Sequence, residues 1–170
     1  MSKYFLGIDQ GTTGVTALLF DKTFTPIANG YCEITQYYPQ NGWVEHDPEN
    51  IWQAVLQATA EAMEKAHAAP GDILAIGIDH EGESVTLWDR ETGKPVYPAI
   101  VWQDNRTAAR AAALNAAHGD LFRRKNALTP DSYFSATKIE WILQNVPFCG
   151  ELLAKNALSP AIWMRGCFTK

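Results

Sequence analysis

A short polar segment, residues 9–14 with the sequence DQGTTG, joins two apolar runs near the start of the chain. Gly11 lets backbone N–H groups approach an anion closely, and the hydroxyls of Thr12 and Thr13 can donate to phosphate oxygens. Asp9 can hold Mg²⁺ directly or through water, because this ion keeps several waters and takes one or two carboxylates. The alternative is a hairpin turn whose threonines merely suit β-structure, since short turns of this composition are common.

A second polar segment, residues 79–83 with the sequence DHEGE, follows the apolar run of residues 73–78. Ligands of open sheets bind beyond strand ends, and burying these charges is costly unless they reach solvent or a polar ligand. Gly82 suggests a kinked backbone or the close approach of a ligand. The alternative is a solvated loop. A metal site is disfavoured because no second histidine is clustered with His80.

Tryptophan is abundant, with six residues in the chain. Trp52 and Trp141 fall on the faces of expected helices and are expected in the core. Trp43 and Trp102 stand at loop edges among polar residues, where an indole either stacks on a sugar face or simply packs. The remaining histidines are expected at the surface or in loops: His46, His67 and His118.

The first half of the chain predicts a meander of strands followed by a helix. The apolar runs at residues 4–9, 15–21 and 27–35 predict three antiparallel strands, with DQGTTG at the first hairpin. Residues 73–78 predict a strand of the fully buried kind. Asp47 can cap a helix whose first position suits a proline. The apolar face of this helix is expected to hold Ile51, Trp52, Val55, Leu56, Thr59 and Met63.

The second half predicts a hairpin and two helices. These are a hairpin of residues 85–88 and 96–102, a helix of residues 106–118 stopped at Gly119, and a helix of residues 135–145 capped by Ser135. Residues 148–170 show no clear period. No internal repeat divides the chain.

Composition excludes several classes of protein. The chain has 170 residues, which allows one domain or one domain and a piece of a second, and its 46% hydrophobic content excludes a disordered chain. A net charge of −5 argues against a nucleic-acid or membrane-surface partner. Three dispersed cysteines, no signal peptide and no apolar window of about 20 residues favour a cytoplasmic protein. The G-x-S-x-G and P-loop motifs are absent from the sequence.

Five segments together resemble the FGGY family of carbohydrate kinases and, within it, the glycerol kinases. They are GIDQGTT (residues 7–13), GWVEHDP (42–48), WDRETGKPVY (88–97), IVWQD (100–104) and YFSATK (133–138). The resemblance runs in order over about residues 3–147. It favours a functional interpretation of both polar segments.

The resemblance implies an α/β, actin-like (ribonuclease-H-like) ATPase domain with a mixed sheet flanked by helices, the N-terminal part of a two-domain kinase. The implied activity is ATP-dependent phosphorylation of a sugar or polyol hydroxyl, with Mg²⁺. Phosphoryl transfer of this kind needs in-line positioning and neutralised oxygens. The resemblance assigns Asp9, Gly11, Thr12 and Thr13 to nucleotide phosphates, Asp9 also to Mg²⁺, and Gly82, Glu83, Trp102 and Tyr133 to the substrate.

The chain departs from the family pattern in three ways. Gly82 stands where glycerol kinases have an arginine, which predicts a substrate larger than glycerol. Residues 14–16 lack the serines and arginine often found there. The family's general-base aspartate lies beyond Lys170, so residues 1–147 are expected to form an incomplete kinase domain and residues 148–170 a divergent segment.

These departures leave alternatives to a working enzyme. One is a truncated or pseudo-kinase fragment that binds ligand or a partner without catalysis. Another is an actin- or Hsp70-like ATPase, which the matches at residues 88–103 and 133–138 disfavour. By itself the chain is expected to be inactive and, with apolar surface meant for missing parts, to associate with itself. The other expected partners are ATP or ADP and the sugar or polyol.

Overall fold

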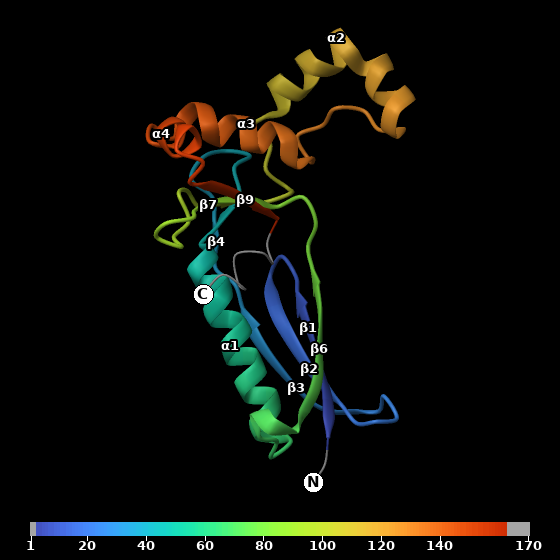
Figure 1. Cartoon of the computed structure of the whole chain (residues 1–170). Helices are drawn as coiled ribbons and strands as arrows, with labels where there is room; N and C mark the ends of the chain where they lie inside the picture. Colours follow the sequence, from blue (N-terminus) through green and yellow to red (C-terminus); the bar gives the residue numbers. More distant parts are fainter. Residues whose placement is uncertain (1–2, 163–170) are drawn as a thin grey trace. The chain divides into compact units, whose positions relative to one another are not determined.

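The computed structural model describes residues 3–162, and the chain folds into two compact units (Figure 1). Unit 1 is formed by Met1–Gln36 and Asp47–Glu81. Unit 2 is formed by Tyr37–His46 and Gly82–Lys170.

Unit 1 is built on a four-stranded mixed sheet with the strand order β3-β2-β1-β6. The strands are β1 (Tyr4–Gln10), β2 (Gly14–Phe20), β3 (Pro26–Glu33) and β6 (Ile73–His80). The first three form an antiparallel meander, and β6 pairs parallel to β1. The predicted hairpin and meander are therefore confirmed. A single turn of 3₁₀-helix, Pro70–Asp72, leads into β6.

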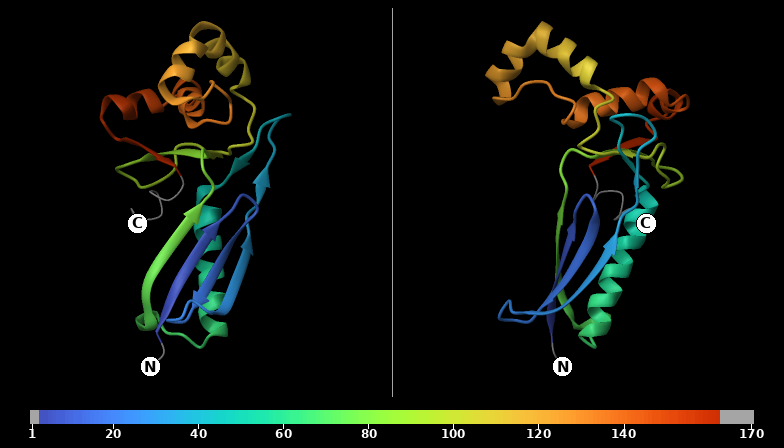
Figure 2. Two further views of the ribbon diagram at one scale, coloured as in Figure 1. Left: turned by 90° about the vertical axis from the view of Figure 1, so that its right-hand side faces the viewer. Right: turned by 180° about the vertical axis from the view of Figure 1, so that it is seen from behind.

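Helix α1 (Pro48–Lys65) packs along one face of this sheet, over β2 and β3 (Figure 2). Its start is the one predicted from the sequence. The carboxylate of Asp47 accepts a hydrogen bond of 2.9 Å from the backbone N–H of Glu49, and proline occupies the first turn.

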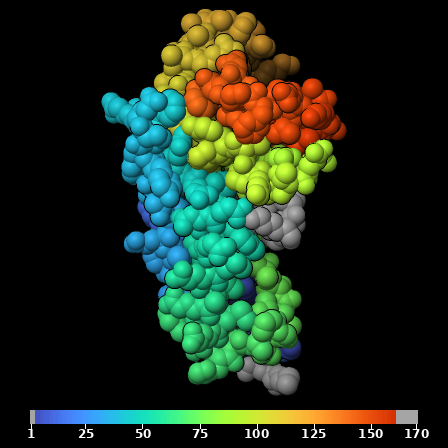
Figure 3. Space-filling view, turned by 90° about the vertical axis from the view of Figure 1, so that its left-hand side faces the viewer, coloured from blue at the N-terminus to red at the C-terminus, as the bar shows by residue number. Residues whose placement is uncertain are grey.

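The buried face of α1 differs from the predicted one. Beside Ile51 it is made of the small residues Ala54, Ala58 and Ala62. The reason is close packing: a Cβ at Gly30 of β3 would lie 2.0 Å from the carbonyl oxygen of Ala58, so helix and strand meet almost backbone to backbone. Of the larger residues predicted to be inside, Leu56 is 44% exposed, on a helix whose outer face is open to view in Figure 3.

The prediction that residues 73–78 form a fully buried strand is wrong. Leu74 and Ile76 are 49% and 58% exposed. The strand β6 is the last in the order of its sheet, and α1 packs over β2 and β3 instead. The apolar run therefore predicted the strand correctly but not its burial.

Unit 2 contains a five-stranded sheet with the order β4-β5-β8-β7-β9. Its strands are β4 (Gln36–Tyr37), β5 (Glu45–His46), β7 (Val85–Asp89), β8 (Ala99–Ile100) and β9 (Leu158–Ile162). Its helices are α2 (Ala108–Asn126), α3 (Ser135–Asn145) and α4 (Cys149–Ala154). The core lies where α3 and α4 meet β7 and β8, and comprises Val85, Leu87, Ile100, Ile142, Val146 and Cys149.

The predicted hairpin is present as the antiparallel pair of β7 and β8, but β8 covers only Ala99–Ile100 of the predicted strand 96–102. Helix α3 has the predicted bounds. Two further details were wrong. Helix α2 continues through Gly119 to Asn126, because one glycine costs a helix only about 1 kcal/mol, and Ala127, whose φ is 61°, is its C-cap. Ser135 is the first residue of α3 and not its cap: Phe134 holds the N-cap position with an extended backbone, and the Ser135 hydroxyl donates to Glu83.

The segment without sequence periodicity contains α4 and β9, and β9 pairs antiparallel with β7. Trp163 and Cys167 lie outside the described residues. Among residues 3–162, no helix is both long and apolar enough to cross a membrane.

Candidate functional site

In unit 1, the predicted phosphate-binding residues gather at the turn between β1 and β2. The N–H of Gly11 donates to the carbonyl oxygen of Gly14 over 3.0 Å, which closes the turn. Thr13 is exposed, Thr12 is half-buried, and Asp9 is exposed near the end of β1. A polar ligand can therefore reach the side chains at this edge of the sheet.

The end of β6 lies beside this turn within unit 1. Asp79 is the parallel partner of Asp9, so the two exposed carboxylates stand on the same face of the sheet. Glu81 donates its backbone N–H to the carbonyl oxygen of Gln10 over 3.0 Å, and its carboxylate accepts a hydrogen bond of 2.6 Å from the hydroxyl of Thr12. The two polar segments found in the sequence thus meet in space.

This edge has the donors that Mg²⁺ prefers. Two carboxylates on one face suit an ion that takes one or two of them and keeps several waters. In the part of the chain that the structure describes, no three or more His, Cys, Asp or Glu side chains are grouped so that they could hold a metal ion.

The predicted substrate-binding residues all belong to unit 2, and their first feature is a strained turn at Glu83. Its φ is 64°, a left-handed value that non-glycine residues seldom adopt. The N–H of Ser84 donates to the carbonyl oxygen of Gly82 over 2.9 Å, which makes a three-residue γ-turn centred on Glu83. Strained backbone of this kind is concentrated at functional sites.

The carboxylate of Glu83 is anchored at the N-terminus of α3. Its Oε2 atom accepts hydrogen bonds from the backbone N–H of Ser135 over 2.7 Å and from the Ser135 hydroxyl over 2.5 Å. The positive end of a helix favours a carboxylate at this position. The side chain of Glu83 is therefore fixed at this position.

Trp102 and Tyr133 form an aromatic pair in the same unit. Their ring centroids are 5.9 Å apart with an interplanar angle of 68°. The N–H of Trp102 donates to the hydroxyl of Ser84 over 3.0 Å, which ties the pair to the residue after Glu83. Tyr133 is 42% exposed. A fixed carboxylate beside aromatic faces is an arrangement that can hold the hydroxyls and C–H groups of a carbohydrate.

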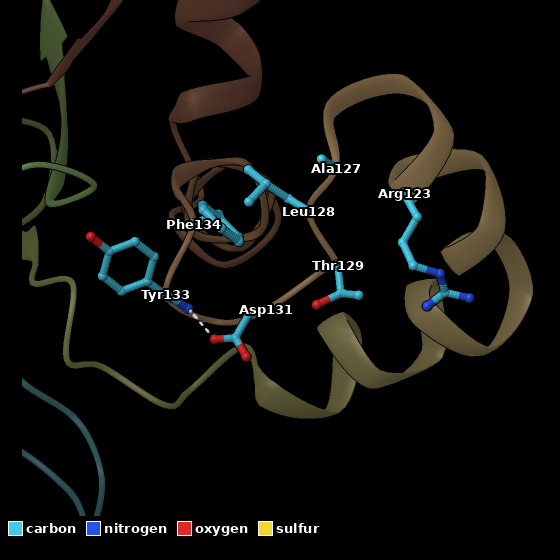
Figure 4. Close-up of a pocket in the computed structure, with 7 residues that line it drawn as sticks. All are labelled: Arg123, Ala127, Leu128, Thr129, Asp131, Tyr133 and Phe134. Carbon is cyan, nitrogen blue, oxygen red and sulfur yellow. Dashed lines mark hydrogen bonds between the residues drawn. The ribbon is translucent and has the colours of Figure 1, made fainter.

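Tyr133 also lies at one end of an open hollow of about 500 Å³ (Figure 4). The hollow is lined by the end of α2 and the loop that follows it: Arg123, Ala127, Leu128, Thr129, Asp131, Tyr133 and Phe134. Within it, the N–H of Tyr133 donates to the Asp131 carboxylate over 2.8 Å.

Sequence reasoning missed the part played by Lys138. Its side chain is fully buried in α3, and its Nζ donates to the backbone carbonyl oxygen of Tyr133. Burial lowers the pKa of Lys138 to about 8, while the carboxylates of Glu83, Asp104 and Asp131 act in the opposite direction. The one available signal was its place in the matched segment of residues 133–138.

Trp43 and Trp141 hold a buried arginine. The Arg106 guanidinium lies 3.8 Å from the ring centroid of Trp43 and 4.7 Å from that of Trp141. It forms ion pairs of 2.8 Å with Glu45 and with Asp104. This contact supports packing, and not sugar stacking, as the role of Trp43.

His46 is a further correction. It was expected at the surface or in a loop, but it lies in β5 with no exposed surface. Burial lowers its pKa to about 4, so it is neutral at pH 7.

The arrangement of strands and helices identifies the class of protein. A meander of three strands, a parallel fourth strand and a covering helix, followed by a second unit, form the N-terminal part of an actin-like ATPase fold, as predicted. Residues 4–170 match the model described as "FGGY family of carbohydrate kinases, N-terminal domain". The chain belongs to this family.

Relatives support the same assignment. Over 156 residues the chain is 49% identical to glycerol kinase 2 of Sulfolobus acidocaldarius, covering 92% of this chain and 31% of the relative. Over 173 residues it is 43% identical to the glycerol kinase of Dichelobacter nodosus, covering 100% and 35%. The chain thus spans about a third of the length of these relatives.

Solved structures agree with the fold. The crystal structure of Plasmodium falciparum glycerol kinase with ADP is 28% identical, with a TM-score of 0.86, and the match covers 94% of this chain and 32% of that one. A xylulose kinase from Brucella ovis is 34% identical, with a TM-score of 0.74, covering 84% and 29%.

Proposed function

We propose that this chain supplies the phosphate-binding turn and part of the substrate pocket of a kinase that transfers phosphate from ATP to a sugar or polyol hydroxyl. The observation that carries the proposal is the strained Glu83, whose carboxylate is fixed by Ser135 beside the aromatic pair of Trp102 and Tyr133. The kinase relatives support the phosphoryl-transfer chemistry, and the glycerol kinase structure with ADP supports the nucleotide.

The nucleotide half of the proposal rests on the turn in unit 1. Gly11, Thr12 and Thr13 offer a backbone N–H and two hydroxyls to the terminal phosphates, and Asp9 would hold Mg²⁺ with Asp79 beside it. When bound, Mg²⁺ neutralises phosphate oxygens during transfer. The protein residues position the phosphates and exclude competing orientations.

The substrate half rests on Gly82, Glu83, Trp102 and Tyr133 in unit 2. A Cβ built on Gly82 has no atom of the described chain within 4 Å, so this position is open. Because Gly82 stands in place of an arginine, we propose a sugar or polyol larger than glycerol as the preferred acceptor. Glu83 would accept hydrogen bonds from its hydroxyls, and the aromatic rings would cover its C–H groups.

The general base is not assigned to any residue of this chain. We propose that this chain forms an incomplete kinase domain and that catalysis requires sequence of the kind found in the longer relatives. By itself the chain would bind ligand without transferring phosphate.

A chimera tests the proposal. In the chimera, this chain replaces the matching part of the Dichelobacter nodosus glycerol kinase. The match covers 100% of this chain and 35% of that kinase. ATP consumption is then measured with a panel of polyols and sugars of three to six carbons. We expect acceptor-dependent turnover that Glu83→Ala reduces by about tenfold or more. A folded chimera without acceptor-dependent turnover would contradict the proposed function.

A further inference from the structure

Lys138 is a buried charge that the proposed roles above do not use. It lies in the second turn of α3, and its side chain has no exposed surface. Burying an ammonium group is costly unless it is paired and hydrogen-bonded. The contacts of Lys138 therefore indicate which parts of the structure its buried charge stabilises.

The hydrogen bond of Lys138 fixes the backbone of Tyr133. Its Nζ donates to the carbonyl oxygen of Tyr133, while the N–H of Tyr133 donates to the Asp131 carboxylate over 2.8 Å. Both polar groups of this peptide backbone are thus held. The ring of Tyr133, opposite Trp102, has its attachment point fixed.

The charge of Lys138 interacts with carboxylates of the same unit. The carboxylates that interact with it electrostatically are Glu83, Asp104 and Asp131. Asp104 is already paired with Arg106 over 2.8 Å, and Asp131 is exposed. Glu83 bonds to the serine at the start of the helix that carries Lys138. Lys138 is thus a buried cation whose charge interacts favourably with that of Glu83.

We propose that Lys138 is a positioning residue of the acceptor pocket, which holds Tyr133 by its backbone and supplies a buried positive charge to the same pocket as Glu83. The inference rests on the proposed function, because it concerns the same pocket. It adds a residue that contacts neither nucleotide nor acceptor.

The titration of Lys138 gives the proposal a distinct pH signature. The pKa of Lys138 is about 8, so the ammonium loses its proton at mildly alkaline pH. A neutral amine no longer supplies this positive charge, and acceptor binding should weaken as pH rises through about 8. Arginine at this position stays charged because its pKa is above 12.

The test uses the chimera, with steady-state kinetics from pH 6.5 to pH 9.5. We expect K138M to raise the KM for the acceptor about tenfold or more and to leave the KM for ATP within about twofold. We expect the wild-type acceptor KM to rise above about pH 8, and K138R to lack this rise. The matched control is K125M, because Lys125 is an exposed lysine at the end of α2, and it should change neither KM.

The outcomes separate the two proposals. A wild-type chimera that phosphorylates no acceptor contradicts the proposed function. An active chimera in which K138M leaves the acceptor KM unchanged, or raises both KM values equally, overturns the positioning role. If K138M does not fold, the pH profiles of wild type and K138R decide: identical profiles overturn the proposal, and an alkaline rise confined to the wild type supports it.

Discussion

The hydroxyl of Thr12 donates a hydrogen bond of 2.6 Å to the Oε2 atom of Glu81, which joins the turn after β1 to the end of β6. A threonine hydroxyl has one proton to donate. To donate to a phosphate oxygen, Thr12 must release Glu81. The contact therefore holds the turn in place when no phosphate occupies it.

This relationship predicts the effect of Thr12→Val in the chimera. Valine has a similar shape but no donor, so nucleotide affinity should fall by roughly 1–3 kcal/mol. Thr12→Ser retains the hydroxyl and serves as the matched control. Equilibrium binding of ATP with Mg²⁺ measures the effect, and equal affinity for both variants and the wild type would remove Thr12 from the phosphate site.

A second prediction concerns the open position at Gly82. In the chimera, Gly82→Arg should shift preference toward glycerol and against five- and six-carbon acceptors, because the new side chain fills space that the larger acceptor would use. The ratio of kcat/KM values for glycerol and the larger acceptors measures the shift. Gly82→Ala leaves most of the space open and should keep the wild-type order. Glycerol as the best acceptor of the wild-type chimera would contradict this account of substrate size.

Much of the fold was predictable from local sequence, and burial was not. The cap at Asp47 and the bounds of α3 follow from residues adjacent in the chain. The alanine face of α1 does not, because it depends on Gly30 of a distant strand allowing close approach. The exposure of β6 likewise depends on where α1 packs.

The site was predictable to a smaller extent. The residue types of the polar turn suggested phosphate chemistry directly, and those of residues 79–83 and of Trp102 suggested ligand binding. Tyr133, and the grouping of Glu83, Trp102 and Tyr133 into one substrate site, came from the family resemblance. The contact of Glu83 with Ser135 and that of Lys138 with Tyr133 are tertiary. Nothing in the spacing of these residues indicates which atoms meet.

His46 predicts a loss of stability in acid. Burial lowers its pKa from 6.5 to about 4, so the unfolded chain binds the proton more readily between these values. The free energy of unfolding should therefore decrease as the pH is lowered below 6.5. The contribution of His46 to this decrease should be about 2 kcal/mol between pH 7 and pH 5. Urea denaturation at both pH values measures it. His46→Gln should lose this component, whereas the exposed control His118→Gln should keep it; equal pH dependence in all three proteins would contradict the assignment.

A further prediction is that the isolated 170-residue chain does not transfer phosphate. It lacks an assigned general base, and the loss of a general base typically lowers the rate of catalysis by about 10²–10⁴-fold. An ATP-consumption assay with the acceptor panel checks this. Acceptor-stimulated turnover near one per second, an ordinary rate for an enzyme, would show that a catalytic base lies within these residues.

The central claim is that unit 1 serves the nucleotide and unit 2 serves the acceptor. The most direct measurement is a kinetic comparison of Thr12→Val and Glu83→Ala in the chimera, with ATP and the preferred acceptor varied in turn. The account predicts that Thr12→Val raises the KM for ATP and leaves the acceptor KM within about twofold, and that Glu83→Ala raises the acceptor KM or lowers kcat while the KM for ATP is retained. The account would be contradicted if each variant changed the kinetic parameters for ATP and for the acceptor to the same degree, or changed neither.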